Sequence, residues 1–172
     1  MKLPEPKIIQ HGRIKVVRDD LLEGGSKTRF LPFLVQGAEE VVFGGPCCGG
    51  APLALSVIAK RMGFKATIFY AQRKELLPRQ KQVAKNGATI HQVPFGYMSN
   101  VQAKARSYAD AAGALFLPLG FDVPEAANPF IEQMHTVRKR IGQPNQIWCA
   151  SGSGMLARCL GLAFPDSEIC AV

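Results

Sequence analysis

The hydrophobic pattern of the chain alternates between two periods. Seven short runs rich in β-branched and aromatic residues predict strands at residues 14–18, 40–43, 66–71, 89–93, 114–118, 146–150 and 168–172. Between them, apolar residues at helical spacing predict helices at residues 27–36, 50–62, 74–85, 100–112, 128–141 and 155–162. This alternation favours right-handed crossovers between parallel strands. The predicted fold class is therefore α/β, a parallel sheet with helices on both faces in three Rossmann-like layers.

Length and composition fit one folded domain, so we expect residues 1–172 to form a single α/β domain. A chain that is 47% hydrophobic and 20% charged is not a disordered one. No apolar run reaches the roughly 18 residues that span a bilayer. The first residues lack the apolar stretch of a secretory signal. We therefore expect a cytoplasmic protein that does not contact a membrane.

The five cysteines and the basic residues are the features that could indicate disulfides, a metal site or nucleic-acid binding. An odd number of cysteines without CxxC or Cys/His spacing predicts neither a disulfide framework nor a metal site. The net charge is +8, and residues 60–86 hold eight basic residues against one acid, Glu75. Such a stretch can contact nucleic acid. Solvated helix faces also explain it, and no nucleic-acid-binding motif accompanies it, so nucleic acid is a possible but not favoured partner.

Ligands of parallel α/β sheets bind where strands end and helices begin, which directs attention to three loops. The segment Ser151-Gly152-Ser153-Gly154-Met155 follows a strand and opens a helix. Its backbone N–H groups and the helix dipole could hold a phosphate, although a tight turn without ligand would have the same sequence. The segment from Gly44 to Ala51 holds four glycines around Cys47 and Cys48, which suggests close approach to a ligand. No histidine is placed in the sequence to activate either thiol.

The third loop places Lys27 after two glycines, with Ser26 as the expected N-cap of the following helix. A lysine at a helix N-terminus opposes the helix dipole, which lowers the pKa of its amine. The neutral amine is the form that makes a Schiff base. This position therefore predicts a chemically competent lysine.

Together these loops resemble the pyridoxal-phosphate enzymes of fold type II, the tryptophan-synthase-beta-like group. The nearest branch is that of aminocyclopropane-carboxylate deaminase and D-cysteine desulfhydrase, with its Arg-Glu-Asp-Leu and Gly-Gly-Asn-Lys-x-Arg-x-Leu segments. Here the matching segments are Arg18-Asp19-Asp20-Leu21 and Gly24-Gly25-Ser26-Lys27-Thr28-Arg29-Phe30-Leu31. The Gly-Gly loop after a strand and the later Gly/Ser-rich phosphate loop follow in the same order.

The resemblance implies a pyridoxal 5'-phosphate cofactor bound covalently to Lys27, which would also act as the acid/base. It implies that Ser151, Gly152, Ser153, Gly154 and Met155 hold the cofactor phosphate. The loop that faces the ring and the substrate would comprise Gly45, Cys47, Cys48, Gly49 and Gly50. In the family this loop carries a Ser-Asn-His-like run, which is absent here.

The resemblance also implies a shortened chain, since the family continues well past the phosphate loop. Residues 1–40 and 145–172 would correspond to part of the family's large domain, and residues 41–144 to its small domain. We expect an amino-acid lyase or deaminase acting on a small amino acid. The alternative is a non-catalytic descendant that binds a phosphorylated small molecule or acts in assembly. The apolar strand that ends at Val172 predicts a homo-oligomer.

Overall fold

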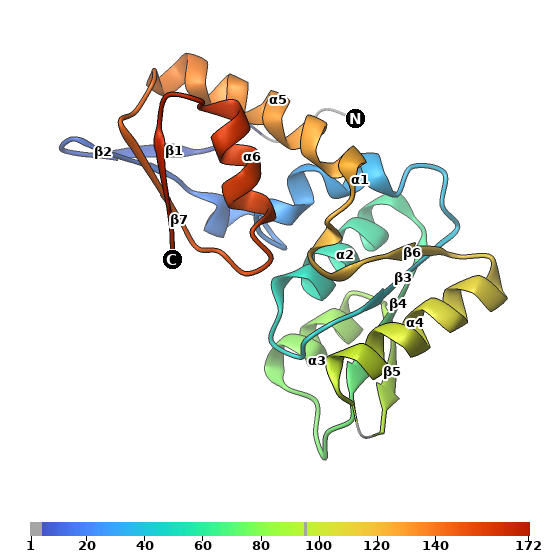
Figure 1. The fold of residues 1–172 in the computed structure, drawn as a ribbon. Helices are drawn as coiled ribbons and strands as arrows, with labels where there is room; N and C mark the ends of the chain where they lie inside the picture. The colour runs from blue at the N-terminus through green and yellow to red at the C-terminus, as the bar shows by residue number, and fades with distance from the viewer. Residues whose placement is uncertain (1–4, 95) are drawn as a thin grey trace.

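A four-stranded parallel sheet forms the centre of one lobe of the molecule (Figure 1). The computed structural model describes residues 5–94 and 96–172. The strands β3 (Glu40–Gly44), β4 (Lys65–Ala71), β5 (Thr89–Val93) and β6 (Leu115–Leu117) lie in the order β5-β4-β3-β6. All three pairings are parallel. The α/β class predicted from the sequence is confirmed.

Helices cover both faces of this sheet because alternate strand residues point to opposite sides. On one face, Val42 and Phe69 pack with Ala105 and Ala109 of α4 (Met98–Ala112). On the other face, Val41, Phe43, Ile68 and Tyr70 belong to the core cluster that contains most of the buried residues of α2 (Gly50–Met62) and Val83 of α3 (Pro78–Lys85). The three-layer arrangement follows from this alternation.

The two ends of the chain form a second lobe, drawn in blue, orange and red in Figure 1. It contains an antiparallel hairpin, a parallel strand pair and two helices. The hairpin is β1 (Ile8–His11) with β2 (Ile14–Val17), and the pair is β7 (Gln146–Cys149) with β8 (Glu168–Ala171). The helices are α5 (Pro124–Ile141) and α6 (Met155–Ala163). The same core cluster joins both lobes, while the proposed division into residues 1–40 with 145–172 and 41–144 stays a prediction.

The segment predicted as a single helix at residues 27–36 is instead broken into short turns. Two 3₁₀ helices, η1 (Asp19–Leu21) and η2 (Ser26–Arg29), precede a four-residue helix, α1 (Leu31–Leu34). Pro32 can occupy only the first turn of α1, because it has no backbone N–H to donate. The chain around Lys27 is therefore held by tertiary contacts more than by a long helix.

Within residues 5–94 and 96–172, no helix combines the length and the apolar character that a membrane span needs. The described side chains include no group of three or more His, Cys, Asp or Glu that could hold a metal ion. The five cysteines are free thiols. The second lobe exposes Trp148, Leu162 and Val172, and the oligomeric state stays a prediction.

Candidate functional site

Lys27 lies half-buried on the 3₁₀ helix η2. Burial lowers the pKa of its amine below the ordinary value of 10.5. The Ser26 N-cap prediction is wrong: Gly25 occupies the cap, with no side-chain capping bond, and Ser26 is the first residue of the turn. Desolvation, rather than the dipole of a long helix, therefore favours the neutral amine. None of the ion pairs found among the described residues involves Lys27.

The two glycines before Lys27 bring this turn close to α2. Gly24 and Gly25 have φ angles of 89° and 74°, in the left-handed region that glycine tolerates. A Cβ on Gly24 would lie 2.9 Å from the Cα of Ala54 in α2. Thr28 completes the turn by donating from Oγ1 to the carbonyl oxygen of Gly25 over 2.7 Å. The Gly-Gly pair thus fixes the entry of the chain into the Lys27 turn.

The loop after β3 is held at its start by neighbouring elements. The Gly45 N–H donates to the Phe69 carbonyl oxygen over 3.0 Å, and the Gln102 amide of α4 donates to the Gly44 carbonyl oxygen. Gly49 is the N-cap of α2 and Gly50 its first residue. The Gly44 carbonyl oxygen and the Gly45 N–H therefore hold the start of the loop in place.

Cys47 and Cys48 of this loop line a cavity of about 500 Å³. Cys47 is half-buried and Cys48 is exposed. The other lining residues belong to α3 and its approach: Leu77, Pro78, Arg79 and Gln82. Arg79 donates from Nη1 to the Cys48 carbonyl oxygen over 3.2 Å. Among the described residues, the lining of this cavity includes neither Lys27 nor the 151–155 loop.

The 151–155 loop connects β7 to α6. The Ser151 N–H donates to the Val172 carbonyl oxygen over 2.8 Å, so it extends the β7–β8 pairing. Gly152 and Ser153 are exposed, Gly154 is the N-cap of α6 with φ 80°, and Met155 is buried as the first helical residue. No backbone bond within the described chain uses the N–H groups of Gly152, Ser153 or Gly154. The N–H groups left for an anion are therefore those after Ser151.

The three loops are linked through Gly120 and Phe121, which follow β6. A Cβ on Gly120 would lie 2.5 Å from the Cβ of Ser153, so this backbone is in direct contact with the 151–155 loop. The ring of Phe121 lies 6.4 Å from that of Phe30, next to the Lys27 turn, and 5.0 Å from that of Phe43 on β3. Phe121 is fully buried and adopts φ 57°, a backbone conformation rare outside glycine. This aromatic hub, formed by Phe30, Phe43 and Phe121, joins the three loops predicted to carry chemistry.

Several residues that build this site have no role predicted from the sequence. Gly120 and Phe121 lie in a segment without a recognised motif. Their role becomes visible only in the packing of segments that are distant in the sequence. Asp19 and Arg29 belong to the two segments that resemble the family's motifs, yet only the structure reveals their ion pair. The basic stretch is partly neutralised, because Arg61 pairs with Glu23 and Lys65 with Glu40.

The hydroxyl of Tyr70 is buried at the end of β4 without a hydrogen-bond partner among the described residues. Burial raises the pKa of this phenol, and the nearby Cys47 adds to the shift. Because an unpaired buried hydroxyl costs free energy, Tyr70→Phe is expected to raise the free energy of unfolding by about 1 kcal/mol. Chemical denaturation measures this change.

Tyr108→Phe is the matched control for Tyr70→Phe. The Tyr108 hydroxyl donates to Glu40 Oε1 over 3.1 Å and accepts from Lys65 Nζ over 3.2 Å. Its removal is expected to lower the free energy of unfolding by about 1 kcal/mol. A loss of stability in Tyr70→Phe would contradict the account, since the hydroxyl would then have a partner in solution.

The fold is similar to that of solved pyridoxal-phosphate enzymes of fold type II, the group whose motifs the sequence resembles. Three similar solved structures are an ACC deaminase homologue, a pyridoxal 5'-phosphate-dependent aspartate racemase, and the O-acetylserine dependent cystathionine beta-synthase of Helicobacter pylori. Their TM-scores are 0.74, 0.69 and 0.73, at sequence identities of 20%, 14% and 17%. The matches cover 90%, 92% and 98% of this chain.

The chain spans only 53%, 50% and 63% of those three proteins, respectively. No family model matches the sequence, and no curated protein matches it. At such low identities the structural likeness establishes the fold alone.

Proposed function

We propose that the protein binds pyridoxal 5'-phosphate through Lys27 and acts on a small amino acid by lyase or deaminase chemistry. The observation that carries this proposal is the half-buried Lys27 amine, which has a lowered pKa and lies on a turn linked by the aromatic hub to an open backbone loop. An amine of this kind reacts with aldehydes at lower pH than a solvated lysine does. The structural neighbours, pyridoxal-phosphate enzymes of fold type II, support the choice of cofactor.

The residues present fit the two reactive ends of this cofactor. The N–H groups of Gly152, Ser153 and Gly154 donate to no described backbone oxygen and lie at the N-terminus of the nine-residue helix α6, which suits a phosphate. Because Gly120 has no side chain, Ser153 can lie against its backbone, and the 151–155 loop can approach the aromatic hub closely. The Lys27 amine, free of ion pairs within the described chain, suits the aldehyde.

Bound pyridoxal phosphate supplies an aldehyde that condenses with amines and a ring that withdraws electrons from the substrate α-carbon. In this proposal Lys27 Nζ would accept the substrate α-proton and pass it to the leaving group or to a carbon of the product, which requires the neutral amine that burial favours. The 152–155 backbone would hold the phosphate of the cofactor and so orient it. The buried rings of Phe30, Phe43 and Phe121 would exclude water from the part of the site that adjoins them.

Attachment of pyridoxal phosphate is expected to depend on pH with a midpoint below 10.5, because burial lowers the Lys27 pKa from that value. The sign follows from the chemistry: only the neutral amine reacts, and a lowered pKa makes it available at lower pH. Borohydride trapping followed by mass spectrometry measures the attached fraction at each pH. An Nα-acetyl-lysine amide is the reference, and a protein profile identical to this reference would contradict the proposal.

A second candidate is a non-catalytic protein that binds a phosphorylated small molecule. It is favoured by Cys47 and Cys48, which stand in place of polar substrate-binding side chains and line a cavity whose described lining does not include Lys27. Equilibrium dialysis against pyridoxal phosphate and against nucleotides separates the candidates. Tight nucleotide binding without pyridoxal-phosphate binding would favour the second.

A further inference from the structure

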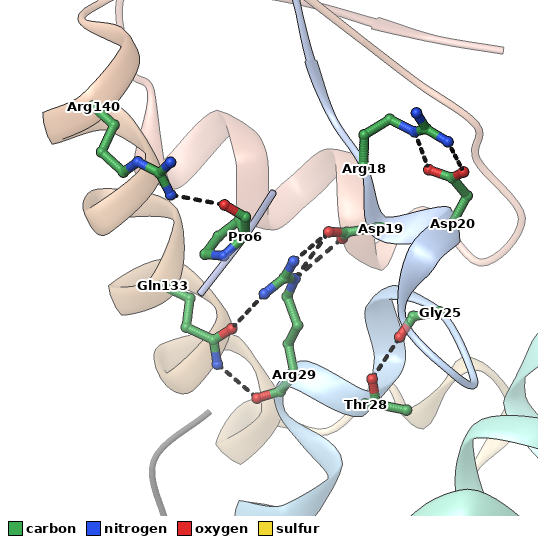
Figure 2. Close-up of polar contacts among 9 residues, drawn as sticks. All are labelled: Pro6, Arg18, Asp19, Asp20, Gly25, Thr28, Arg29, Gln133 and Arg140. Carbon is green, nitrogen blue, oxygen red and sulfur yellow. Dashed lines mark hydrogen bonds and ion pairs between the residues drawn. The ribbon is translucent and has the colours of Figure 1, made fainter. Parts of the chain in front are cut away.

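The turn that carries Lys27 ends in a buried arginine. Arg29 is 1% exposed, and its guanidinium donates from Nε to both carboxylate oxygens of Asp19, over 3.1 and 3.2 Å. A further bond runs from Nη2 to the same carboxylate. Figure 2 shows this fork between the side chains of Arg29 and Asp19. Asp19 thus reaches across from η1 and fixes the side chain two residues after Lys27.

Gln133 of α5 holds the same arginine from the other side (Figure 2). Its amide nitrogen donates to the Arg29 backbone carbonyl oxygen over 2.6 Å. Its amide oxygen accepts from Arg29 Nη1 over 3.4 Å. One side chain, 104 residues away in sequence, therefore fixes both the backbone and the guanidinium of Arg29.

These tertiary bonds matter because η2 is poorly stabilised by its own backbone. The Thr28 N–H donates to Gly25 over 3.1 Å and the Phe30 N–H to Lys27 over 3.4 Å, and 3₁₀ bonds have weak geometry. A buried ion pair contributes little net stability, since desolvation of the two charges offsets their attraction. A role in placing the turn explains the pair better than a role in stability.

We infer that Asp19, Arg29 and Gln133 form a positioning clamp that sets where the Lys27 amine lies relative to the aromatic hub. Asp19 and Gln133 do not touch the reacting atoms; they act through Arg29 on the backbone of the turn. This inference rests on the proposed function for its consequence, the capture of pyridoxal phosphate by Lys27. The clamp itself can be tested without any cofactor.

The chain offers a matched control one residue away from the clamp. Arg18 and Asp20 form the same kind of fork, at 2.9 and 2.7 Å, but their side chains are 31% and 60% exposed. Figure 2 shows this pair pointing away from Arg29. Asp20→Asn therefore removes an equivalent ion pair that does not involve the Lys27 turn.

The test compares Gln133→Met, Asp19→Asn and Asp20→Asn by competitive acetylation in cofactor-free protein, with mass spectrometry reporting the pKa of Lys27. In the two clamp variants this pKa is expected to move toward its ordinary 10.5, and the affinity for pyridoxal phosphate to fall about tenfold to hundredfold. Asp20→Asn is expected to leave the Lys27 pKa unchanged and to change the affinity for pyridoxal phosphate by no more than about twofold. Gln133→Met keeps the buried charge pair and decides the matter if Asp19→Asn does not fold.

A Gln133→Met protein that keeps both the wild-type Lys27 pKa and the wild-type affinity would overturn the clamp. So would equal changes in Asp20→Asn. A purely structural role, which would also overturn it, would lower the denaturation midpoint while leaving the Lys27 pKa in place. If the wild-type protein fails to bind pyridoxal phosphate, the proposed function fails, and the acetylation measurement still tests the clamp.

Discussion

Lys27→Ala is expected to abolish covalent capture of pyridoxal phosphate, from one borohydride-stable adduct per chain to none. The reason is that Lys27 combines partial burial, a lowered pKa and freedom from ion pairs within the described chain. Intact-protein mass spectrometry after reduction measures the adduct. Non-covalent binding through the phosphate is expected to survive in part, since the 152–155 loop is unchanged.

Lys81→Ala is the control for this experiment. Lys81 is an exposed lysine on α3, and its removal is expected to leave capture at the wild-type level. A Lys27→Ala protein that still forms one adduct at low cofactor concentration would show that another lysine is the attachment point. The proposed function would then lose its main support.

Gly120→Ala is expected to lower the free energy of unfolding by about 2 kcal/mol or more and to weaken pyridoxal-phosphate binding. A left-handed backbone at φ 77° costs a non-glycine residue about 1–2 kcal/mol. In addition, the new Cβ would lie 2.5 Å from the Cβ of Ser153, so the backbone of one loop must move. Chemical denaturation and cofactor titration measure the two effects.

Gly63→Ala is the control for Gly120→Ala, because it introduces the same kind of backbone strain without a contact with Ser153. Gly63 has φ 80° at the end of α2, and no described atom lies within 4 Å of the place that a Cβ would take. This variant is expected to lose about 1–2 kcal/mol of stability with unchanged cofactor affinity. Equal effects of the two substitutions on affinity would mean that the Gly120–Ser153 contact does not support the loop.

Secondary structure was largely predictable because the apolar periods are strong and the connections are short. The strand at 40–43 and the helix at 50–62 are found almost as predicted, since Val41, Val42 and Phe43 form a continuous buried run and Ala54, Leu55 and Ile58 repeat at helical spacing. The helix predicted at 74–85 starts instead at Pro78, which suits the first turn. The hairpin strand β1 was missed, because Ile8 and Ile9 give too short an apolar run beside polar neighbours.

The site was predictable where a local motif carries it and not where packing does. Lys27 and the glycines of the 151–155 loop stand out in the sequence because turns and helix starts have local signatures. The hydrogen bonds of the Asp19–Arg29–Gln133 clamp join residues up to 104 positions apart, and bonds at that separation leave no periodic trace. The prediction of Ser26 as an N-cap is wrong for a related reason. The long helix predicted to follow it is a short turn held by those distant contacts.

The central claim is that one pyridoxal-phosphate molecule reaches from Lys27 to the 152–155 backbone. The most direct test is the ratio of the affinities for pyridoxal phosphate and for pyridoxal, in the wild type and in Ser153→Asp. The wild type is predicted to prefer the phosphorylated form, and the added carboxylate of Ser153→Asp to reduce that preference by about tenfold or more through like-charge repulsion. Condensation of pyridoxal with Lys27 should continue. An unchanged preference in Ser153→Asp would place the phosphate elsewhere and contradict the account.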